Sequence, residues 1–382
     1  MRILQIGKYY APARGGMETA LRNMTEGLLA AGHEVRVLVA GNARRTSRED
    51  LPGSAGGLIR AGVLGTWSSQ PLTLGLPRLL RGEIARFQPD IVHLHVPNPL
   101  ACWSWLRVAR SGPGRRPLLA IWHHADILRQ RFGGQLVAPL VRRCLGYAAG
   151  VCVSSETWRA TSSELAAWRD RVRVIPFGID PEPFLARTPA GGGPFVFIGR
   201  LVPYKGLMVL LEALARLPAA ELDIVGTGPQ HRVLARRCAQ SDLRERVRLR
   251  GEVPDTALPA LLAASRALVL PSQDRSETFG LVLLEAMAAG LPLVTSDLPT
   301  GVRELNRPGQ NGWLAAPGDV LDLRRQLAAV LADPAEARRR GLAGRERVTR
   351  DFTRVRMAAD LTAWYTELLD SRGTGTAGAP AG

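Results

Sequence analysis

The sequence contains few cysteines and no long apolar run. Its 382 residues include four cysteines, Cys102, Cys144, Cys152 and Cys238, and no two of them are spaced as C-x-x-C. This spacing supports neither a disulfide framework nor a thiolate metal site, so a reducing cytoplasm is the expected compartment. No apolar stretch reaches the roughly 18–20 residues that cross a bilayer. The opening MRILQIGKYY resembles a first strand rather than a signal peptide.

Lysine is almost absent, since Lys8 and Lys205 are the only two. The net charge is nevertheless +16, from 50 Lys and Arg against 34 Asp and Glu, so the positive charge is almost entirely arginine. Such a bias can come from genome composition alone. Because no arginine block is interleaved with aromatic residues, nucleic acid is not an expected partner. An anionic membrane surface remains a candidate partner.

The length and composition indicate two soluble domains. The chain is too long for one ordinary core, and 46% of its residues are hydrophobic and 22% charged. A strand at 2–6, a loop with glycine and proline, an amphipathic helix at 18–31 and a strand at 35–40 open the chain. This order predicts a parallel, doubly wound α/β sheet. The prolines and three consecutive glycines within 181–194 predict a linker.

The stretch from Ala267 to Ser296 carries the strongest functional pattern. A short apolar strand at 267–270 is followed by a polar loop, a helix at 279–289 and a strand at 293–295. The loop therefore lies at the carboxyl end of a parallel strand, where open α/β sheets bind ligands.

Two glutamates, Glu277 and Glu285, lie eight residues apart in this stretch. Glu285 is the one charged residue of an otherwise apolar and therefore buried helix, and a buried carboxylate needs a partner. Glu277 lies at the helix entrance, where the helix dipole favours an anion. From the residues alone, two interpretations stay open: a helix-capping Glu277 with a salt-bridged Glu285, or two carboxylates lining a ligand site.

A glycine turn with two cations follows the strand at 195–198, in Gly199–Arg200 and Lys205–Gly206. Arg200 can grip a diphosphate bidentately and Lys205 offers a point charge. Ordinary surface charge is the alternative.

Two further glycine pairs follow predicted strands. Gly15 and Gly16 precede the helix at 18–31, where the backbone can approach a phosphate closely, although turn glycines look the same. Gly226 and Gly228 form a G-x-G without the third glycine, which is weak evidence for dinucleotide binding.

Histidines gather near two other strand ends. His93 and His95 lie two positions apart in the strand at 91–95, so both side chains point to one face. Two interpretations stay open for them: a metal-binding pair or packing residues. His123, His124 and Asp126 close the strand at 117–122, and a polar cluster at that position is a candidate site. A hydrogen-bonded structural histidine is the alternative.

Taken together, these motifs resemble those of the retaining glycosyltransferases of the GT-B fold, in the large group-1 family that uses nucleotide sugars. The core is E-x7-E with F-G-L-x-x-x-E-A-M at 277–287. Four further motifs match at their expected places: G-G-x-E at 15–18, P-D-[IV]-[VI]-H-x-H at 89–95, P-x-G-[IV]-D at 176–180 and G-R-x-x-x-x-K-G at 199–206. The segment after the strand at 117–122 is similar to the family's W-H-S-D-I-x-R-Q. This match places His124, Asp126, Arg129 and Gln130 in register.

The resemblance implies a GT-B architecture of two Rossmann-like doubly wound domains facing a central cleft. Residues 1–178, joined by a C-terminal helix at about 352–370, would form the acceptor-side domain. Residues 179–194 would be the linker and 195–351 the nucleotide-sugar-binding domain. The Gly-, Ala- and Thr-rich residues 371–382 are expected to be disordered.

The implied reaction is transfer of a hexose, with retention of anomeric configuration, from GDP-mannose or a UDP-hexose. The acceptor would be a saccharide or lipid-linked saccharide of surface polysaccharide or glycolipid synthesis, and neither metal nor cofactor is expected. The implied catalytic residues are His124, Arg200, Lys205 and Glu277. The implied donor-binding residues are Gly16, Gly199, Gly226, Gly228, Phe279, Gly280, Leu281 and Glu285.

Two other functions compete with this one. A GT-B sugar-nucleotide epimerase would share the fold but lack the pairing of E-x7-E with G-R and K-G. A basic binding protein with a relic active site would keep the fold and lose turnover. The expected location is the cytoplasm, with the inner face of the cytoplasmic membrane as a candidate surface for peripheral attachment.

Overall fold

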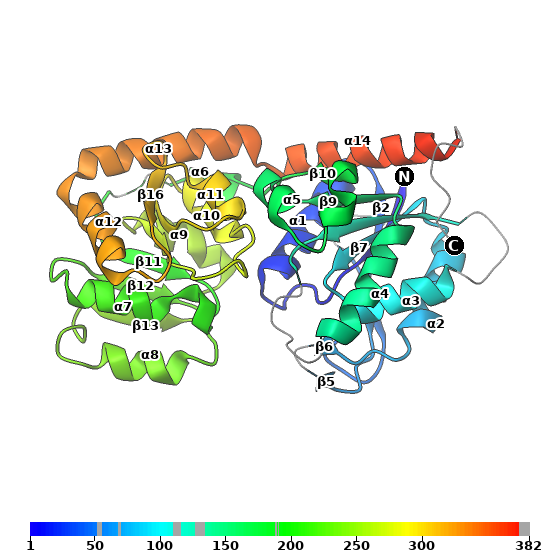
Figure 1. Cartoon of the computed structure of the whole chain (residues 1–382), viewed down its shortest axis with the longest axis horizontal. Coiled ribbons are helices and arrows are strands. Elements are labelled where there is room, and N and C mark those ends of the chain that lie inside the picture. Colours follow the sequence, from blue (N-terminus) through cyan, green and yellow to red (C-terminus); the bar gives the residue numbers. More distant parts are fainter. Residues whose placement is uncertain are drawn as a thin grey trace. The chain divides into compact units, whose positions relative to one another are not determined.

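The computed structural model describes residues 1–51, 56–67, 70–109, 116–126, 134–187, 189 and 191–373. The chain divides into two compact units (Figure 1). The N-terminal unit is Met1–Gly178 together with the chain from Arg354 onward, and the second unit is Ile179–Thr353.

The N-terminal unit is built on an eight-stranded sheet with the order β10-β9-β8-β7-β1-β2-β4-β3. All pairs are parallel except β3 with β4, so the sheet ends in one antiparallel edge strand. The central strands are buried almost throughout because both of their faces are covered, and they include the buried polar residues Gln5, His93 and His95. The strands are β1 (Arg2–Ile6), β2 (Glu34–Ala40), β3 (Ser47–Asp50), β4 (Gly57–Ala61), β7 (Ile91–Val96), β8 (Leu118–His123), β9 (Gly150–Val153) and β10 (Val172–Val174), with a separate hairpin of β5 (Thr66–Trp67) and β6 (Gln70–Pro71).

Six helices lie within the described residues of this unit. They are α1 (Gly16–Ala30), α2 (Leu76–Phe87), α3 (Pro99–Val108), α4 (Gly134–Tyr147), α5 (Glu156–Thr161) and α14 (Arg354–Gly373), and a 3-10 turn spans Ala166–Arg171. The last helix packs against α1 (Figure 1), and Arg354 pairs with Glu26 there. It continues to Gly373 rather than ending at about 370, so the first residues of the expected disordered tail are helical. The rest of that tail, 374–382, lies outside the described residues.

The second unit holds a six-stranded, fully parallel sheet with the order β13-β12-β11-β14-β15-β16. Its strands are β11 (Phe195–Ile198), β12 (Leu222–Val225), β13 (Val247–Gly251), β14 (Leu268–Leu270), β15 (Leu293–Ser296) and β16 (Gly312–Ala315). The helices are α6 (Glu182–Leu185), α7 (Leu207–Ala215), α8 (His231–Cys238), α9 (Leu258–Ala263), α10 (Leu281–Ala288), α11 (Gly301–Leu305), α12 (Val320–Ala332) and α13 (Pro334–Asp351). The two parallel sheets confirm the predicted pair of doubly wound α/β domains.

The segment 179–194, expected as a linker, is partly structured. Ile179 donates its backbone N–H to Phe352 and forms a bridge with Thr353, and Glu182–Leu185 is a single helical turn whose Phe184 is buried. This part of the segment therefore belongs to the second unit, because an apolar side chain buried in its core ties it there.

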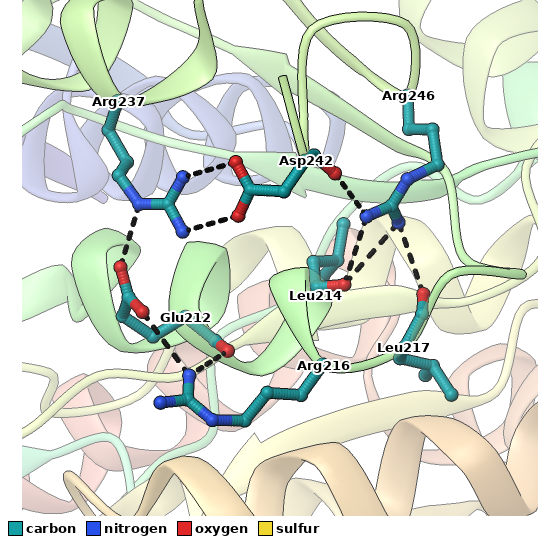
Figure 2. A network of polar contacts seen from close by, with 7 residues as sticks. All are labelled: Glu212, Leu214, Arg216, Leu217, Arg237, Asp242 and Arg246. Carbon is teal, nitrogen blue, oxygen red and sulfur yellow. Dashed lines mark hydrogen bonds and ion pairs between the residues drawn. The ribbon is translucent and has the colours of Figure 1, made fainter. Parts of the chain in front are cut away.

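An arginine network closes one end of helix α7 (Figure 2). Arg237 is forked onto both oxygens of Asp242 and also reaches Glu212 at 2.7 Å. Arg246 donates to the carbonyl oxygens of Leu214, Leu217 and Ala220, the last at 2.7 Å. These carbonyls lie at and just beyond the C-terminus of α7, where a helix leaves acceptors unsatisfied and favours a cation.

We expect Arg246→Ala to destabilise the second unit by about 1–2 kcal/mol, because several backbone acceptors lose a charged donor at once. The measurement is thermal unfolding followed by circular dichroism. Arg244→Ala is the matched control, since Arg244 is an exposed neighbour with one backbone bond, to Ala239. Equal melting temperatures for the two variants would contradict the role given to Arg246.

Candidate functional site

Three loops meet at the carboxyl edge of the second unit's sheet. They follow β11, β12 and β14, which are neighbours in the strand order. The first loop carries Arg200 and Lys205, the second carries the glycines 226 and 228, and the third carries Glu277. Parallel pairing brings these loops to the same edge although they are far apart in the sequence.

Lys205 and Glu277 form a nearly buried ion pair. Nζ of Lys205 donates to Oε2 of Glu277 at 2.5 Å, and the two residues are 9% and 7% exposed. The hydroxyl of Ser272 donates to the same oxygen at 3.0 Å. The structure therefore brings together two of the residues proposed from the sequence and adds Ser272. Its position directly after β14 and Pro271 is the signal that could have identified it.

The ion pair fixes the charge on Lys205. Burial alone lowers the pKa of Lys205. The charge of Glu277, the electrostatic effect of Tyr204 and the hydrogen bond to Glu277 outweigh burial and raise that pKa above its ordinary value. The charge of Arg200, whose side chain is exposed, acts in the opposite direction and lowers the pKa of the Lys205 ammonium. Gly199 lies beside this ammonium, because a Cβ at that position would be 3.6 Å from Nζ of Lys205. The edge therefore presents two permanent cations.

The backbone holds Lys205 and Ser272 in register. The N–H of Gln273 donates to the carbonyl of Tyr204 at 2.7 Å, which ties the third loop to the 3-10 turn Pro203–Lys205. Gly206 has φ +71° and comes so close to the loop that a Cβ would lie 2.0 Å from the carbonyl oxygen of Pro271. Glycine at 206 therefore allows the two segments to approach as closely as the ion pair requires.

Helix α10 begins two residues later than the sequence pattern predicted. It spans Leu281–Ala288, with Gly280 as the N-cap and no side-chain cap. Phe279 is buried and Leu281 opens the first turn, in which the N–H of Leu283 donates to the carbonyl of Gly280 at 2.8 Å. The helix-capping interpretation of Glu277 is therefore wrong, because its carboxylate is turned to Lys205 instead. Glu285 is only half-buried rather than buried, because the side of α10 that carries it and Val282 is not fully covered.

The glycines of the second loop are required by packing. A Cβ on Gly226, whose φ is +128°, would lie 2.0 Å from the carbonyl oxygen of Gly199, and one on Gly228 would lie 2.5 Å from that of Leu201. The N–H of Leu201 also donates to the carbonyl of Thr227 at 2.9 Å. These contacts explain the G-x-G pattern by the backbone contact between two loops, whether or not a nucleotide lies above them.

Gly16 differs from these glycines. It is exposed as the first residue of α1, and a Cβ there would meet nothing within 4 Å. Packing in the described residues therefore does not demand glycine at 16, whereas a ligand approaching the helix N-terminus would.

This contrast predicts opposite outcomes for two alanine variants. Gly226→Ala should destabilise the second unit by about 1–3 kcal/mol, because its backbone conformation and the clash are both unfavourable for alanine. Gly16→Ala, its matched control, should unfold at the wild-type temperature and lose activity. Thermal unfolding measures the stability of each variant, and donor turnover measures its activity. A Gly226→Ala variant as stable as the wild type would contradict the packing explanation.

In the N-terminal unit, His124 lies in a stack of buried rings. Its Nε2 is 2.8 Å from Nδ1 of His95, and its ring stacks on Trp122 and Phe177. His93 contacts the hydroxyl of Tyr365 on α14 at 2.6 Å. The structure therefore favours the packing interpretation of His93 and His95. The same stack leaves His124 only 5% exposed, so any contact of its ring with a ligand would be limited to one edge.

His123, Asp126 and Glu164 form the cluster of the described residues that comes closest to a metal site, with one ligand atom from each within 4.8 Å of the others. Nε1–H of Trp158 donates to Nδ1 of His123 at 3.2 Å, so the proton of the neutral ring lies on Nε2, which is 3.1 Å from Glu164. A ring protonated at Nε2 cannot ligate a metal through that atom. The cluster is therefore better described as a hydrogen-bond network, and Arg129 and Gln130 of the same motif lie outside the described residues.

Comparison with known proteins identifies the family. The model for glycosyl transferases group 1 matches residues 187–347, and the model for Glycosyltransferase Family 4 matches residues 14–183. The chain is 30% identical over 363 residues to the D-rhamnosyltransferase WbpZ of Pseudomonas aeruginosa, and 92% of each chain is covered. This chain belongs to the group-1 glycosyltransferases.

Further matches extend over the whole transferase. The O-antigen chain mannosyltransferase C of Escherichia coli is 28% identical over 383 residues, which cover 97% of this chain and all of that one. The structure of Anabaena HepE in complex with UDP-glucose superposes with a TM-score of 0.76 at 19% identity, over 96% of this transferase and all of HepE. The predicted GT-B fold class is confirmed. The epimerase alternative is not supported, because the family is one of glycosyltransferases.

Proposed function

We propose that this glycosyltransferase moves a hexose from GDP-mannose or a UDP-hexose to a saccharide or lipid-linked saccharide, in surface polysaccharide or glycolipid synthesis, with retention of configuration. The observation that carries the proposal is the Lys205–Glu277 pair at 2.5 Å, at the sheet edge where the loop after β11 also carries Arg200. The likeness to an O-antigen mannosyltransferase and to a UDP-glucose complex supports the choice of donors and acceptor class.

The arrangement suits a departing nucleoside diphosphate. Lys205 uses one N–H on Glu277 and keeps two others, and Arg200 adds a planar fork, so charge that develops on the leaving group meets fixed cations. Glu277 would bind hydroxyls of the donor sugar, with help from N–H groups near Phe279 and Leu281. Glu285 would accept hydrogen bonds from the ribose.

Retention is proposed to occur without a covalent intermediate. Glu277 is engaged by Lys205 and Ser272, which makes it a poor nucleophile because its negative charge is already hydrogen-bonded. A diphosphate oxygen of the leaving group would instead take the acceptor proton on the same face of the sugar. Determining the anomeric configuration of the product by NMR tests this point, and an inverted product would refute it.

Metal independence is part of the proposal, because the two cations at 200 and 205 can supply the charge that a metal would otherwise contribute. Turnover should therefore survive EDTA.

We also propose that the protein is cytoplasmic and meets a lipid-linked acceptor at the inner membrane face. Its net charge of +16 supports this attachment. No helix in the described ranges has both the length and the apolar character to cross a membrane. Co-sedimentation with anionic but not neutral vesicles is the expected result, and equal recovery with both would refute the attachment.

The first experiment is thermal stabilisation of the purified protein by UDP, GDP, ADP and their sugars. A shift with one base would establish the nucleotide site and the donor class, since a ligand that binds only the folded state raises its stability. Slow hydrolysis of that donor without acceptor would then exclude the relic alternative, which predicts none. The absence of any shift would refute the proposed function.

Glu285→Ala should lower the affinity for the nucleoside diphosphate by about tenfold, because hydrogen bonds from the ribose to a carboxylate would be lost. Titration calorimetry with the nucleotide that stabilises the wild type measures this. Glu245→Ala, which removes an exposed carboxylate elsewhere on the second unit, serves as the control. Unchanged affinity in the Glu285 variant would remove it from the ribose site.

A further inference from the structure

Ser272 is a fully buried hydroxyl inside the proposed donor site. Ser272 is 0% exposed, and its hydroxyl donates a hydrogen bond to Oε2 of Glu277 at 3.0 Å. It directly follows Pro271, whose carbonyl is in close contact with Gly206, and precedes Gln273, whose N–H is bonded to Tyr204 at 2.7 Å. The serine is therefore held on both sides by the turn that carries Lys205.

Both donors to the Glu277 carboxylate reach the same oxygen. Nζ of Lys205 and Oγ of Ser272 converge on Oε2, and among the described residues no other side chain donates to this carboxylate. Oε1 therefore keeps its lone pairs for a further donor. The backbone of the turn is fixed as well, because the N–H of Glu277 donates to the carbonyl of Asp274 at 3.2 Å.

The orientation of a carboxylate is not set by its own rotamer. The terminal torsion of glutamate has a broad, roughly two-fold energy profile, so only hydrogen bonds hold the plane of the group. With Lys205 as the single donor, the carboxylate could turn and share both oxygens with the three N–H groups of the ammonium. A second donor from a different direction removes that freedom.

We propose that Ser272 is a positioning residue, which holds Glu277 on Lys205 through Oε2 and so keeps Oε1 available to a hydroxyl of the donor sugar. This inference rests on the proposed function, because it concerns the sugar half of the same donor site. Ser272 acts through Glu277 and does not itself contact the diphosphate.

The test compares two affinities in one variant. For whichever base stabilises the wild type, calorimetry gives the affinity for the nucleoside diphosphate (UDP or GDP) and for the nucleotide sugar (UDP-glucose or GDP-mannose). In Ser272→Ala, the affinity for the diphosphate should stay within about twofold. The advantage of the nucleotide sugar should fall by about tenfold, which is the loss expected for one hydrogen bond to a charged group.

A matched control is available in Ser265→Ala. Ser265 is also buried, and its hydroxyl donates at 2.8 Å to the carbonyl of Leu261 on α9, away from the ion pair. This variant should keep both affinities. In a Glu277→Gln background, Ser272→Ala should cause no further loss, because the two residues would act through one contact.

The outcomes separate the inference from the proposed function. A wild-type protein that binds neither ligand overturns the proposed function and this inference with it. A wild type that prefers the nucleotide sugar, with the same preference in Ser272→Ala, overturns the inference alone. Equal loss of both affinities in Ser272→Ala also overturns it, because that result would mean a general structural role.

Discussion

Replacing Lys205 with alanine should lower kcat for the transferase by about 10²-fold or more. The leaving diphosphate would lose a preorganised cation, and removal of one such electrostatic contact costs about 10²–10³ in turnover. The variant should also be less stable, because Glu277 would remain 7% exposed without its counter-charge. Donor hydrolysis, measured below the unfolding temperature of each variant, gives kcat.

A second variant separates the lost charge from the lost stability. Lys205→Ala combined with Glu277→Gln removes the unpaired carboxylate, so the melting temperature should recover while turnover stays low. Arg339→Ala, which removes an exposed positive charge from α13, controls for net charge and should keep wild-type kcat. Wild-type turnover in Lys205→Ala would remove this lysine from the site.

Acidification from pH 7.5 to 5.5 should destabilise the N-terminal unit by about 4 kcal/mol. Burial lowers the pKa of His95 to about 3 and holds the pKa values of His93 and His124 well below 6.5. Below pH 6.5 the unfolded chain therefore binds protons that the folded unit does not, and stability falls as the pH falls. Each histidine contributes about 1.4 kcal/mol at one pH unit below its unfolded pKa.

Thermal unfolding across this pH range measures the effect. His95→Gln should remove about a third of the pH dependence, because one of the three buried rings no longer titrates. His231→Gln is the control, since His231 is exposed on the second unit and should leave the pH profile unchanged. A melting temperature that does not change between pH 7.5 and 5.5 would contradict this account of the histidine stack.

Several site residues could be placed from sequence because their neighbours define a strand end. Lys205 and Glu277 each follow a short apolar strand, and parallel pairing brings such ends to one edge. Their direct contact could not be read in the same way, because it joins residues 72 positions apart. The capping interpretation of Glu277 was wrong for that reason, since the helix dipole is a local effect and the lysine is a distant partner.

The burial of individual side chains was less predictable. The pattern of α10 suggested a buried Glu285, yet the helix is not fully covered on that side and the carboxylate is half-exposed. His124 follows a strand, where the sequence allowed either a site residue or a hydrogen-bonded structural histidine, and its ring is stacked on Trp122 and Phe177. In both cases the deciding neighbours come from other parts of the chain, which no periodicity records.

The sequence by itself determined the two parallel α/β sheets, the order of their elements and the glycosyltransferase motifs at the strand ends, because apolar runs, helical spacing and turn residues act over a few positions. Only the tertiary structure decided that Ser272 and Lys205 share one oxygen of Glu277, and that Gly226 serves a contact between loops. It also decided that His93, His95 and His124 are buried as neutral rings. These features depend on which distant surfaces are brought into contact, and that is settled by packing of the whole unit.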